Sequence, residues 1–212
     1  MSGVFGALKC EFNIYDDIFD NNPNLVCFQN GTYDLENNIF RESKKEDYIT
    51  KCISYDFTII SDDDPRMLKC EEFLRKVMPE DDKRDLLLTC LATSLRSITL
   101  EKFIVLTGNG RNGKDTLITY LMKNTLCESG FYYETNANVI TGDSKSELNV
   151  ALNNCHKKNM IVINEPASNK KIICNQVKHI TGGSNVNARG LYSSVTETKI
   201  NCRVISDTIT LQ

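Results

Sequence analysis

The stretch Phe103-Ile-Val-Leu-Thr-Gly-Asn-Gly-Arg-Asn-Gly-Lys-Asp-Thr116 decides the fold of this 212-residue chain. Its first four residues are apolar and predict a buried strand. The loop that follows fits the pattern G-x-x-x-x-G-K from Gly108 to Lys114. Four apolar residues then have the spacing of one helical face: Leu117, Ile118, Leu121 and Met122. A strand, a glycine loop and a helix in this order are the context that a phosphate-binding loop requires.

The chemistry of such a loop explains its residue types. Glycines allow the backbone to curl so that successive N–H groups point at phosphate oxygens, and the helix N-terminus adds a favourable dipole. Lys114 is expected to reach the β and γ phosphates of ATP and is a candidate catalytic residue. The pattern alone can arise by chance, and the flanking strand and helix favour the functional interpretation. The predicted nucleotide-binding residues are Gly108, Asn109, Gly110, Arg111, Asn112, Gly113, Lys114, Asp115 and Thr116.

Asp115 departs from the pattern, which has Ser or Thr after the lysine because a hydroxyl binds Mg²⁺ without adding charge. A carboxylate can also bind Mg²⁺, but here it would stand beside an anionic triphosphate. Thr116 cannot replace it, because the next helical position points about 100° away. Asp115 is therefore both a candidate Mg²⁺ ligand and the expected weakness of the site.

A second apolar run ends in a carboxylate at Met160-Ile-Val-Ile-Asn-Glu-Pro166. An acid at the tip of a central strand beside the glycine-loop strand can hold Mg²⁺-bound water or polarise an attacking water. Glu165 is the candidate for both the catalytic and the metal role, and Asn164 stands where many such proteins have a second acid. The structural alternative is a strand that simply ends at a polar turn before proline.

The composition is that of an ordinary globular protein, with 41% hydrophobic and 25% charged residues. The net charge of −3 and the pI near 5.5 exclude a generally basic surface, so any nucleic-acid contact must be local. Apolar runs are only a few residues long, and the N-terminus lacks the features of a signal peptide. We therefore expect an intracellular protein that neither crosses a membrane nor is secreted.

The nine cysteines are spread singly along the chain. No C-x-x-C pair occurs, so the sequence gives a zinc site little support. The odd count and the apolar neighbourhoods of most cysteines predict reduced, buried thiols in a cytosol-like compartment.

The chain divides into three segments that differ in their predicted secondary structure. Residues 1–63 are β-rich, and residues 64–98 are helical, with an acidic cap before Pro65 that predicts a helix start. Residues 99–212 alternate strands with helices after the glycine loop. This alternation predicts an α/β nucleotide-binding core with a mostly parallel sheet in a three-layer arrangement.

Several local elements are also predicted within these segments. Asn30-Gly31 signals a tight turn after an apolar strand, and a second turn at 36–38 completes a small β-meander. Helices are expected at 147–154 and 172–180. Extended sequence is expected at 186–191 and 199–205.

Short motifs spaced along the chain carry a resemblance to a known family. They are Asn30-Gly-Thr-Tyr-Asp-Leu35, Glu46-Asp-Tyr-Ile-Thr50, the glycine loop, Asn164-Glu-Pro166, Val177-Lys-His-Ile-Thr-Gly-Gly183 and Ala188-Arg-Gly-Leu-Tyr192. In this order they resemble the poxvirus-type primase-helicase family of large DNA viruses, over residues 22–205. The resemblance implies a helicase superfamily 3 motor with an AAA+ P-loop fold, which uses ATP and Mg²⁺ in viral DNA replication.

The resemblance also implies roles and partners. Glu165 matches the Walker B acid, and Asn112 fits the Asn-Gly-Lys form that is common in the superfamily. Lys178 and residues 181–192 match the region that leads into a pore-facing hairpin, where Arg189 is the natural phosphate-contacting candidate. Solvated surface charge remains the alternative for Lys178 and Arg189. The implied partners are single-stranded DNA and full-length helicase subunits or a hexamer of the chain itself, in the host cytoplasm or at the viral replication site.

The sequence departs from the family in several places. Asp115 replaces Ser or Thr, and no Asn stands at the tip of the expected strand at 199–205, where the family senses the γ-phosphate. The family's arginine finger and its preceding primase domain have no counterpart, so we expect a truncated module. Two alternatives stay open: an ATP-binding helicase-type NTPase module, or a non-catalytic pseudoenzyme that binds nucleotide or a full-length helicase partner. A small nucleotide kinase has less support, because no lid-like run of arginines occurs.

Overall fold

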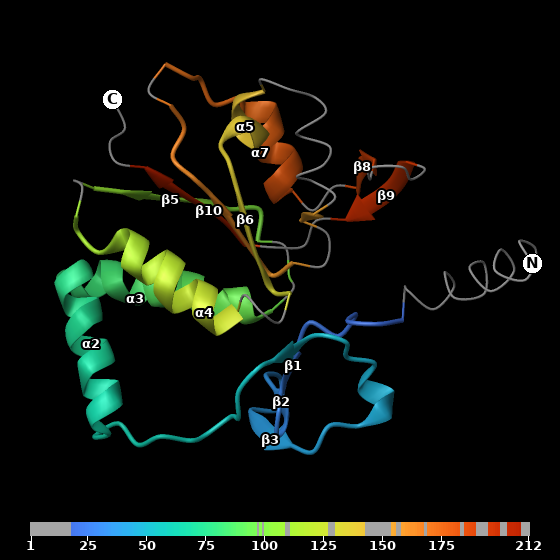
Figure 1. Ribbon diagram of the computed structural model, residues 1–212, viewed down its shortest axis with the longest axis vertical. Coiled ribbons are helices and arrows are strands. Elements are labelled where there is room, and N and C mark those ends of the chain that lie inside the picture. Colours follow the sequence, from blue (N-terminus) through green and yellow to red (C-terminus); the bar gives the residue numbers. More distant parts are fainter. Residues whose placement is uncertain are drawn as a thin grey trace, which may run out of the picture. The chain divides into compact units, whose positions relative to one another are not determined.

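The computed structural model forms two compact units, Met1–Phe57 and Thr58–Gln212 (Figure 1). The residues that the structure describes are 18–96, 98, 100–108, 111–126, 130–142, 154–155, 158–167, 169–182, 185–189, 195–199 and 203–208. The helical segment predicted at 64–98 falls within the second unit.

The first unit is a four-stranded sheet with the order β3-β2-β1-β4. Its strands are β1 (Leu25–Phe28), β2 (Gly31–Asp34), β3 (Ile39–Arg41) and β4 (Cys52–Ile53). The first three pair antiparallel with their neighbours in sequence, whereas β4 returns to lie parallel to β1. One residue of β1, Val26, and one of β4, Ile53, are buried, so the strands share a small core.

The first turn is displaced by one residue from the predicted position. Phe28 pairs with Gly31, so Gln29 and Asn30 form the loop and Gly31 begins β2. Glycine is needed at this place because an added Cβ atom would lie 2.5 Å from the carbonyl oxygen of Arg41. The amide of Asn30 instead clamps the chain at Phe57, accepting from its N–H and donating to its C=O at 2.9 Å each.

Two consecutive helices begin the second unit, α2 (Pro65–Val77) and α3 (Asp81–Ala92), and a short 3₁₀-helix η2 (Thr93–Leu95) follows. Asp64 caps α2 by accepting a hydrogen bond of 2.8 Å from the N–H of Arg66. The predicted helix start at Pro65 is therefore confirmed.

The sheet of the second unit has the order β5-β10-β7-β6, and all of its neighbouring strands are parallel. The strands are β5 (Phe103–Thr107), β6 (Tyr132–Thr135), β7 (Met160–Ile163) and β10 (Arg203–Thr208). All four residues of β7 are buried, as expected for a strand that is covered on both faces. The predicted α/β class with a parallel sheet is confirmed.

Helices lie on both sides of this sheet (Figure 1). After the glycine loop the chain forms a π-helix, η3 (Thr116–Met122), and continues as α4 (Lys123–Leu126). The helices α5 (Asn138–Thr141) and α7 (Cys174–Thr181) lie on the opposite side from α3 and α4. The core beneath α5 and α7 consists of Ala137, Val139, Ile140, Cys155, Ile161, Ile163, Ile180 and Val204.

Two expectations about strands were wrong. The glycine-loop strand β5 and the strand β7 are not neighbours, because β10 lies between them and pairs with both. The extended stretch expected at 199–205 is divided between β9 (Val195–Lys199) and β10, and β10 continues to Thr208. The strand β9 pairs antiparallel with β8 (Asn185–Arg189).

The helix expected at 147–154 lies almost wholly outside the described residues. Among the residues that the structure does describe, no helix is long and apolar enough to cross a membrane.

Candidate functional site

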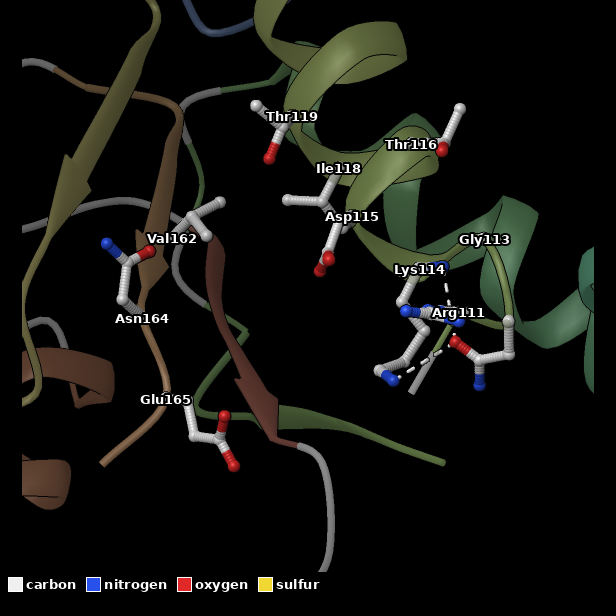
Figure 2. Close-up of a pocket in the computed structure, with 11 residues that line it drawn as sticks. Arg111, Gly113, Lys114, Asp115, Thr116, Ile118, Thr119, Val162, Asn164 and Glu165 are labelled. Carbon is white, nitrogen blue, oxygen red and sulfur yellow. Dashed lines mark hydrogen bonds between the residues drawn. The ribbon is translucent and has the colours of Figure 1, made fainter. Parts of the chain in front are cut away.

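A cavity of about 710 Å³ lies between the glycine loop, residues 108–114, and the carboxyl end of β7 (Figure 2). It brings together two sequence segments that are separated by about fifty residues. Its lining residues are Arg111, Asn112, Gly113, Lys114, Asp115, Thr116, Ile118, Thr119, Val162, Asn164 and Glu165. Most of the predicted nucleotide-binding residues and both predicted catalytic residues therefore face one space. Asn109 and Gly110 lie outside the described residues.

Lys114 is the buried cation of this cavity, with 8% of its surface exposed. Its Nζ donates to Oδ1 of Asn112 at 3.1 Å, and its backbone N–H is directed to the same oxygen at 3.4 Å. The amide of Asn112 is packed against Gly108, where an added Cβ atom would clash with Nδ2. Gly108 thus makes room for the side chain that holds Lys114.

Among the loop residues that the structure describes, two lie in the left-handed region of backbone conformation. Arg111 has a φ of 64° and Gly113 has a φ of +86°. This conformation is unfavourable for residues with a Cβ atom, and glycine adopts it freely. The sharp turn at Gly113 leads directly into the helix, so that Lys114 occupies its first turn.

Two carboxylates face the cavity from opposite walls. Asp115 points from the first turn of the helix toward the space before β7, and Glu165 stands just beyond the end of β7 (Figure 2). Both residues are exposed. No group of three or more His, Cys, Asp or Glu side chains with metal-site geometry occurs among the described residues. A Mg²⁺ ion held by Asp115 and Glu165 would therefore need further oxygen ligands from water or a nucleotide.

Thr119 and Asn164 also line the cavity, although neither was predicted as a binding residue. Thr119 follows Asp115 by one helical turn, and this i, i+4 spacing is the signal that could have found it. The backbone N–H of Asn164 donates to the carbonyl of Thr135 at 2.9 Å, which ties the ends of β7 and β6 together.

Lys178 and Arg189 are not among the residues that line the cavity. Lys178 is exposed on α7, and its carbonyl accepts from the N–H of Gly182 at the end of that helix, at 2.8 Å. Arg189 is the last residue of β8 and is paired with Val195 in the hairpin.

Sequence comparisons place relatives of the chain in large DNA viruses. Residues 2–79 match the family model described as "D5 N terminal like". The chain is 34% identical over 195 residues to the protein named Putative helicase L207/L206 of Acanthamoeba polyphaga mimivirus, and 28% identical over 200 residues to Putative helicase 121R of Invertebrate iridescent virus 3. Each alignment covers 88% of this chain, and the chain spans about a fifth of the length of these relatives (20% and 21%).

A solved structure shares the fold. The structure described as "The apo structure of NrS-1 C terminal region (305-718)" superposes with a TM-score of 0.53 at 20% identity, over 66% of this chain and 33% of that one. At this identity the likeness concerns the fold alone. The viral relatives and the D5 N terminal like segment confirm the resemblance to the primase-helicase proteins of large DNA viruses that the motifs predicted.

Proposed function

We propose that this chain is an ATP-binding, helicase-type NTPase module of viral DNA replication. The observation that carries the proposal is the single cavity that joins Lys114 and the glycine loop to Glu165. The kinship with viral proteins named as helicases supports the same assignment. The chain acts, in this proposal, where the viral DNA is replicated in the host cell.

In the proposed complex the triphosphate of ATP lies over the glycine loop. The backbone N–H groups and the helix N-terminus bind its oxygens, and Lys114 neutralises the β and γ phosphates. Nucleotide binding would exchange the bond from Lys114 to Asn112 for a charge-assisted bond to phosphate. Asp115 would bind Mg²⁺ from the helix side. Glu165 would bind it through water or orient the attacking water from the strand side.

The AAA+ and superfamily 3 assignment also belongs to this proposal. The insertion of β10 between β5 and β7 supports it, since the tip of β10 then lies between the two strands that carry the site. Ser206, buried at 2% exposure, is paired with Val105 on one side and Ile163 on the other. The residues that follow it would be closest to the γ-phosphate.

The partners proposed for the module are single-stranded DNA and further helicase subunits, assembled as a hexamer. Lys178 and the β8–β9 hairpin with Arg189 would face the DNA phosphates. The chain has a net charge of −3, so a local contact with DNA is favoured and a broad basic binding surface is not.

Asp115 favours a second candidate function, a non-catalytic module that binds nucleotide or a helicase partner without turnover. A carboxylate beside the β and γ phosphates disfavours the triphosphate by like-charge repulsion unless Mg²⁺ lies between them. The two candidates differ in one observable, which is the release of phosphate by nucleotide-bound protein.

Binding of Mg²⁺–ATP to the Lys114→Ala variant tests the proposal, with Lys123→Ala as a matched control. Lys123 lies on the same helical stretch but contacts Glu134 at 3.2 Å and does not line the cavity. Calorimetry should show that Lys114→Ala weakens binding by about tenfold or more, because hydrogen bonds to charged groups contribute about 1.5–3 kcal/mol. Lys123→Ala should leave the affinity nearly unchanged. Equal losses in both variants, or no binding by the wild type, would contradict the proposed site.

Phosphate release then separates the two candidates. If the wild type hydrolyses ATP, Glu165→Gln should keep nucleotide affinity and lose turnover. If the wild type binds ATP without release, both alone and with DNA present, the non-catalytic candidate is favoured.

A further inference from the structure

Two cysteines that are far apart in sequence lie side by side in the first unit. Cys27 of β1 and Cys52 of β4 are direct partners in the parallel ladder. Adjacent strands lie about 4.7–4.9 Å apart, and disulfides join Cα atoms that are about 4.4–6.8 Å apart. Both residues are free thiols of intermediate exposure. The backbone therefore already holds them at a separation that a disulfide requires.

The two thiols also have matching orientations. Register partners in a parallel ladder project to the same face of the sheet. The Sγ of Cys27 donates to the carbonyl of Phe28 at 3.5 Å, and the Sγ of Cys52 donates to the carbonyl of Ile53 at 3.4 Å. Each thiol thus leans toward the carbonyl of the next residue on its own strand, and the two sulfurs stay on corresponding sides of their strands.

We propose that Cys27 and Cys52 form an oxidisable dithiol, a modification site at which hydrogen peroxide closes a disulfide between β1 and β4. In the first step a cysteine thiolate attacks one peroxide oxygen, the O–O bond breaks and hydroxide leaves, which gives a sulfenic acid; the hydroxide takes up the proton that the thiol released and becomes water. In the second step the other sulfur attacks it, the S–O bond breaks, a second water leaves and the S–S bond forms. Two thiols lose two electrons in total, and one peroxide is reduced to two waters.

The environment distinguishes the roles of the two sulfurs. Burial, together with its hydrogen bond to Cys27, raises the pKa of Cys52 to about 11. The thiol of Cys52 therefore stays protonated near neutral pH, which assigns it to the second step. The hydroxyl of Ser43 lies 4.0 Å from the Sγ of Cys27 and gives that thiol a polar neighbour. By contrast, burial raises the pKa of Cys155 to about 12, and this residue is 0% exposed, so it should resist oxidation.

The bond would fasten the least extensively paired strand of the first unit. β4 is two residues long, and in the part of the chain that the structure describes it pairs with β1 alone. A disulfide would close a loop that contains β2 and β3. Cross-linking a loop of this size restricts the unfolded chain and stabilises the fold. The oxidised protein should therefore unfold at a higher temperature than the reduced protein.

Peptide mapping of the full chain after brief treatment with hydrogen peroxide tests the proposal. Free thiols are alkylated before digestion without reductant. Trypsin places Cys27 in the peptide 10–41 and Cys52 in the peptide 52–66. Because Cys10 shares the first of these peptides, the experiment uses the Cys10→Ser background. Further variants in this background are Cys27→Ser, Cys52→Ser and, as a matched control, Cys174→Ser, which removes a cysteine that is exposed on α7.

The expected product is a cross-linked pair of these peptides, lighter by two hydrogen atoms than the two reduced peptides together and separated again by dithiothreitol. Cys174→Ser should form the same product, and neither Cys27→Ser nor Cys52→Ser should form it. Oxidation should raise the Tm of the unit by on the order of 10 °C. The same oxidation should leave the Tm of Cys27→Ser and the Tm of Cys52→Ser unchanged. The proposal would be overturned if the peptides 10–41 and 52–66 were recovered separately, with Cys27 and Cys52 alkylated, under conditions that oxidise other cysteines. A disulfide that joins Cys27 or Cys52 to a different cysteine would also overturn it.

Discussion

Gly113 of the glycine loop packs against Val77, the last residue of α2. A Cβ atom added at Gly113 would lie 2.7 Å from Cγ2 of Val77 and 3.9 Å from Cε2 of Phe73. At the other end of the same helical segment, the carbonyl of Leu95 accepts from Nδ2 of Asn159 at 3.1 Å, next to the start of β7. The helices α2 and α3 are thus part of the scaffold that holds both walls of the cavity.

Replacing Gly113 by Ala should destabilise the second unit by about 1–3 kcal/mol, because the residue has a φ of +86° and because the new methyl group would meet Val77. Urea unfolding of a double-mutant cycle with Val77→Ala separates the two causes. Val77→Ala should cost less in the Gly113→Ala background than alone, since it removes the clash and leaves the backbone strain. Simple additivity of the two changes would show that the contact is not significant.

The Asp115→Ser variant should bind Mg²⁺–ATP more tightly than the wild type, by roughly three- to tenfold. The change restores a neutral oxygen ligand and removes a negative charge from the cavity that would hold the phosphates. Calorimetry at fixed Mg²⁺ measures the difference. Asp85→Ser makes the same change on the exposed side of α3 and should have little effect. If Asp115→Ser binds more weakly, Asp115 is a metal ligand that the site requires.

Several elements could be predicted from the sequence because their signals are local. The strand β7 was predicted with the bounds that the structure has, since four consecutive apolar residues are buried on both faces. The cap at Asp64 and the glycine loop are likewise decided by adjacent residues. Asp115 and Glu165 could be assigned to one site because each follows an apolar strand of the same α/β unit.

The remaining features depend on contacts between distant residues. The position of β10 between β5 and β7 depends on which strands pair with each other, and no residue of β10 indicates which strands it pairs with. Gly31 was interpreted as a turn residue, but its role comes from the close approach of Arg41 in another strand. The pairing of Cys27 with Cys52 has the same origin, because it depends on the register between two strands that are far apart in the sequence.

The stability of the first unit should depend on pH through Asp47. Arg41 donates two hydrogen bonds to this carboxylate, at 2.7 and 2.8 Å, and only 9% of the Asp47 side chain is exposed. The hydrogen bond from Arg41, with that from the backbone of Lys44, lowers the pKa of Asp47 below its ordinary value of 3.8. Because the folded-state pKa is depressed, the stabilisation is fully present above the ordinary value and is lost as the pH falls through the folded-state pKa.

The Asp47→Asn variant should therefore lower the free energy of unfolding by about 1–2 kcal/mol at pH 7, since it leaves the Arg41 guanidinium without its charge partner. The difference from the wild type should shrink as the pH falls below 3.8. Thermal unfolding at a series of pH values measures it, with Asp56→Asn, an exposed residue of the same unit, as the control. If the difference in stability between Asp47→Asn and the wild type were the same at every pH, the ion pair between Arg41 and Asp47 would not be its cause.

The Arg189→Ala variant should weaken binding to single-stranded DNA of every sequence, because a phosphate contact carries no base information. In a plot of the logarithm of affinity against the logarithm of salt concentration, the slope should become shallower by about 1. This is the change expected when one phosphate contact, and the counterion that it releases, is lost. Fluorescence anisotropy with two labelled oligonucleotides of different sequence, over a range of salt concentrations, measures both effects. Arg75→Ala is the matched control, since it removes an exposed arginine from α2 that is paired with Glu71. Two outcomes would contradict the prediction: an equal loss of affinity in both variants, or an effect of Arg189→Ala on sequence preference alone. Either would show that the β8–β9 hairpin does not contact the phosphates of the DNA backbone.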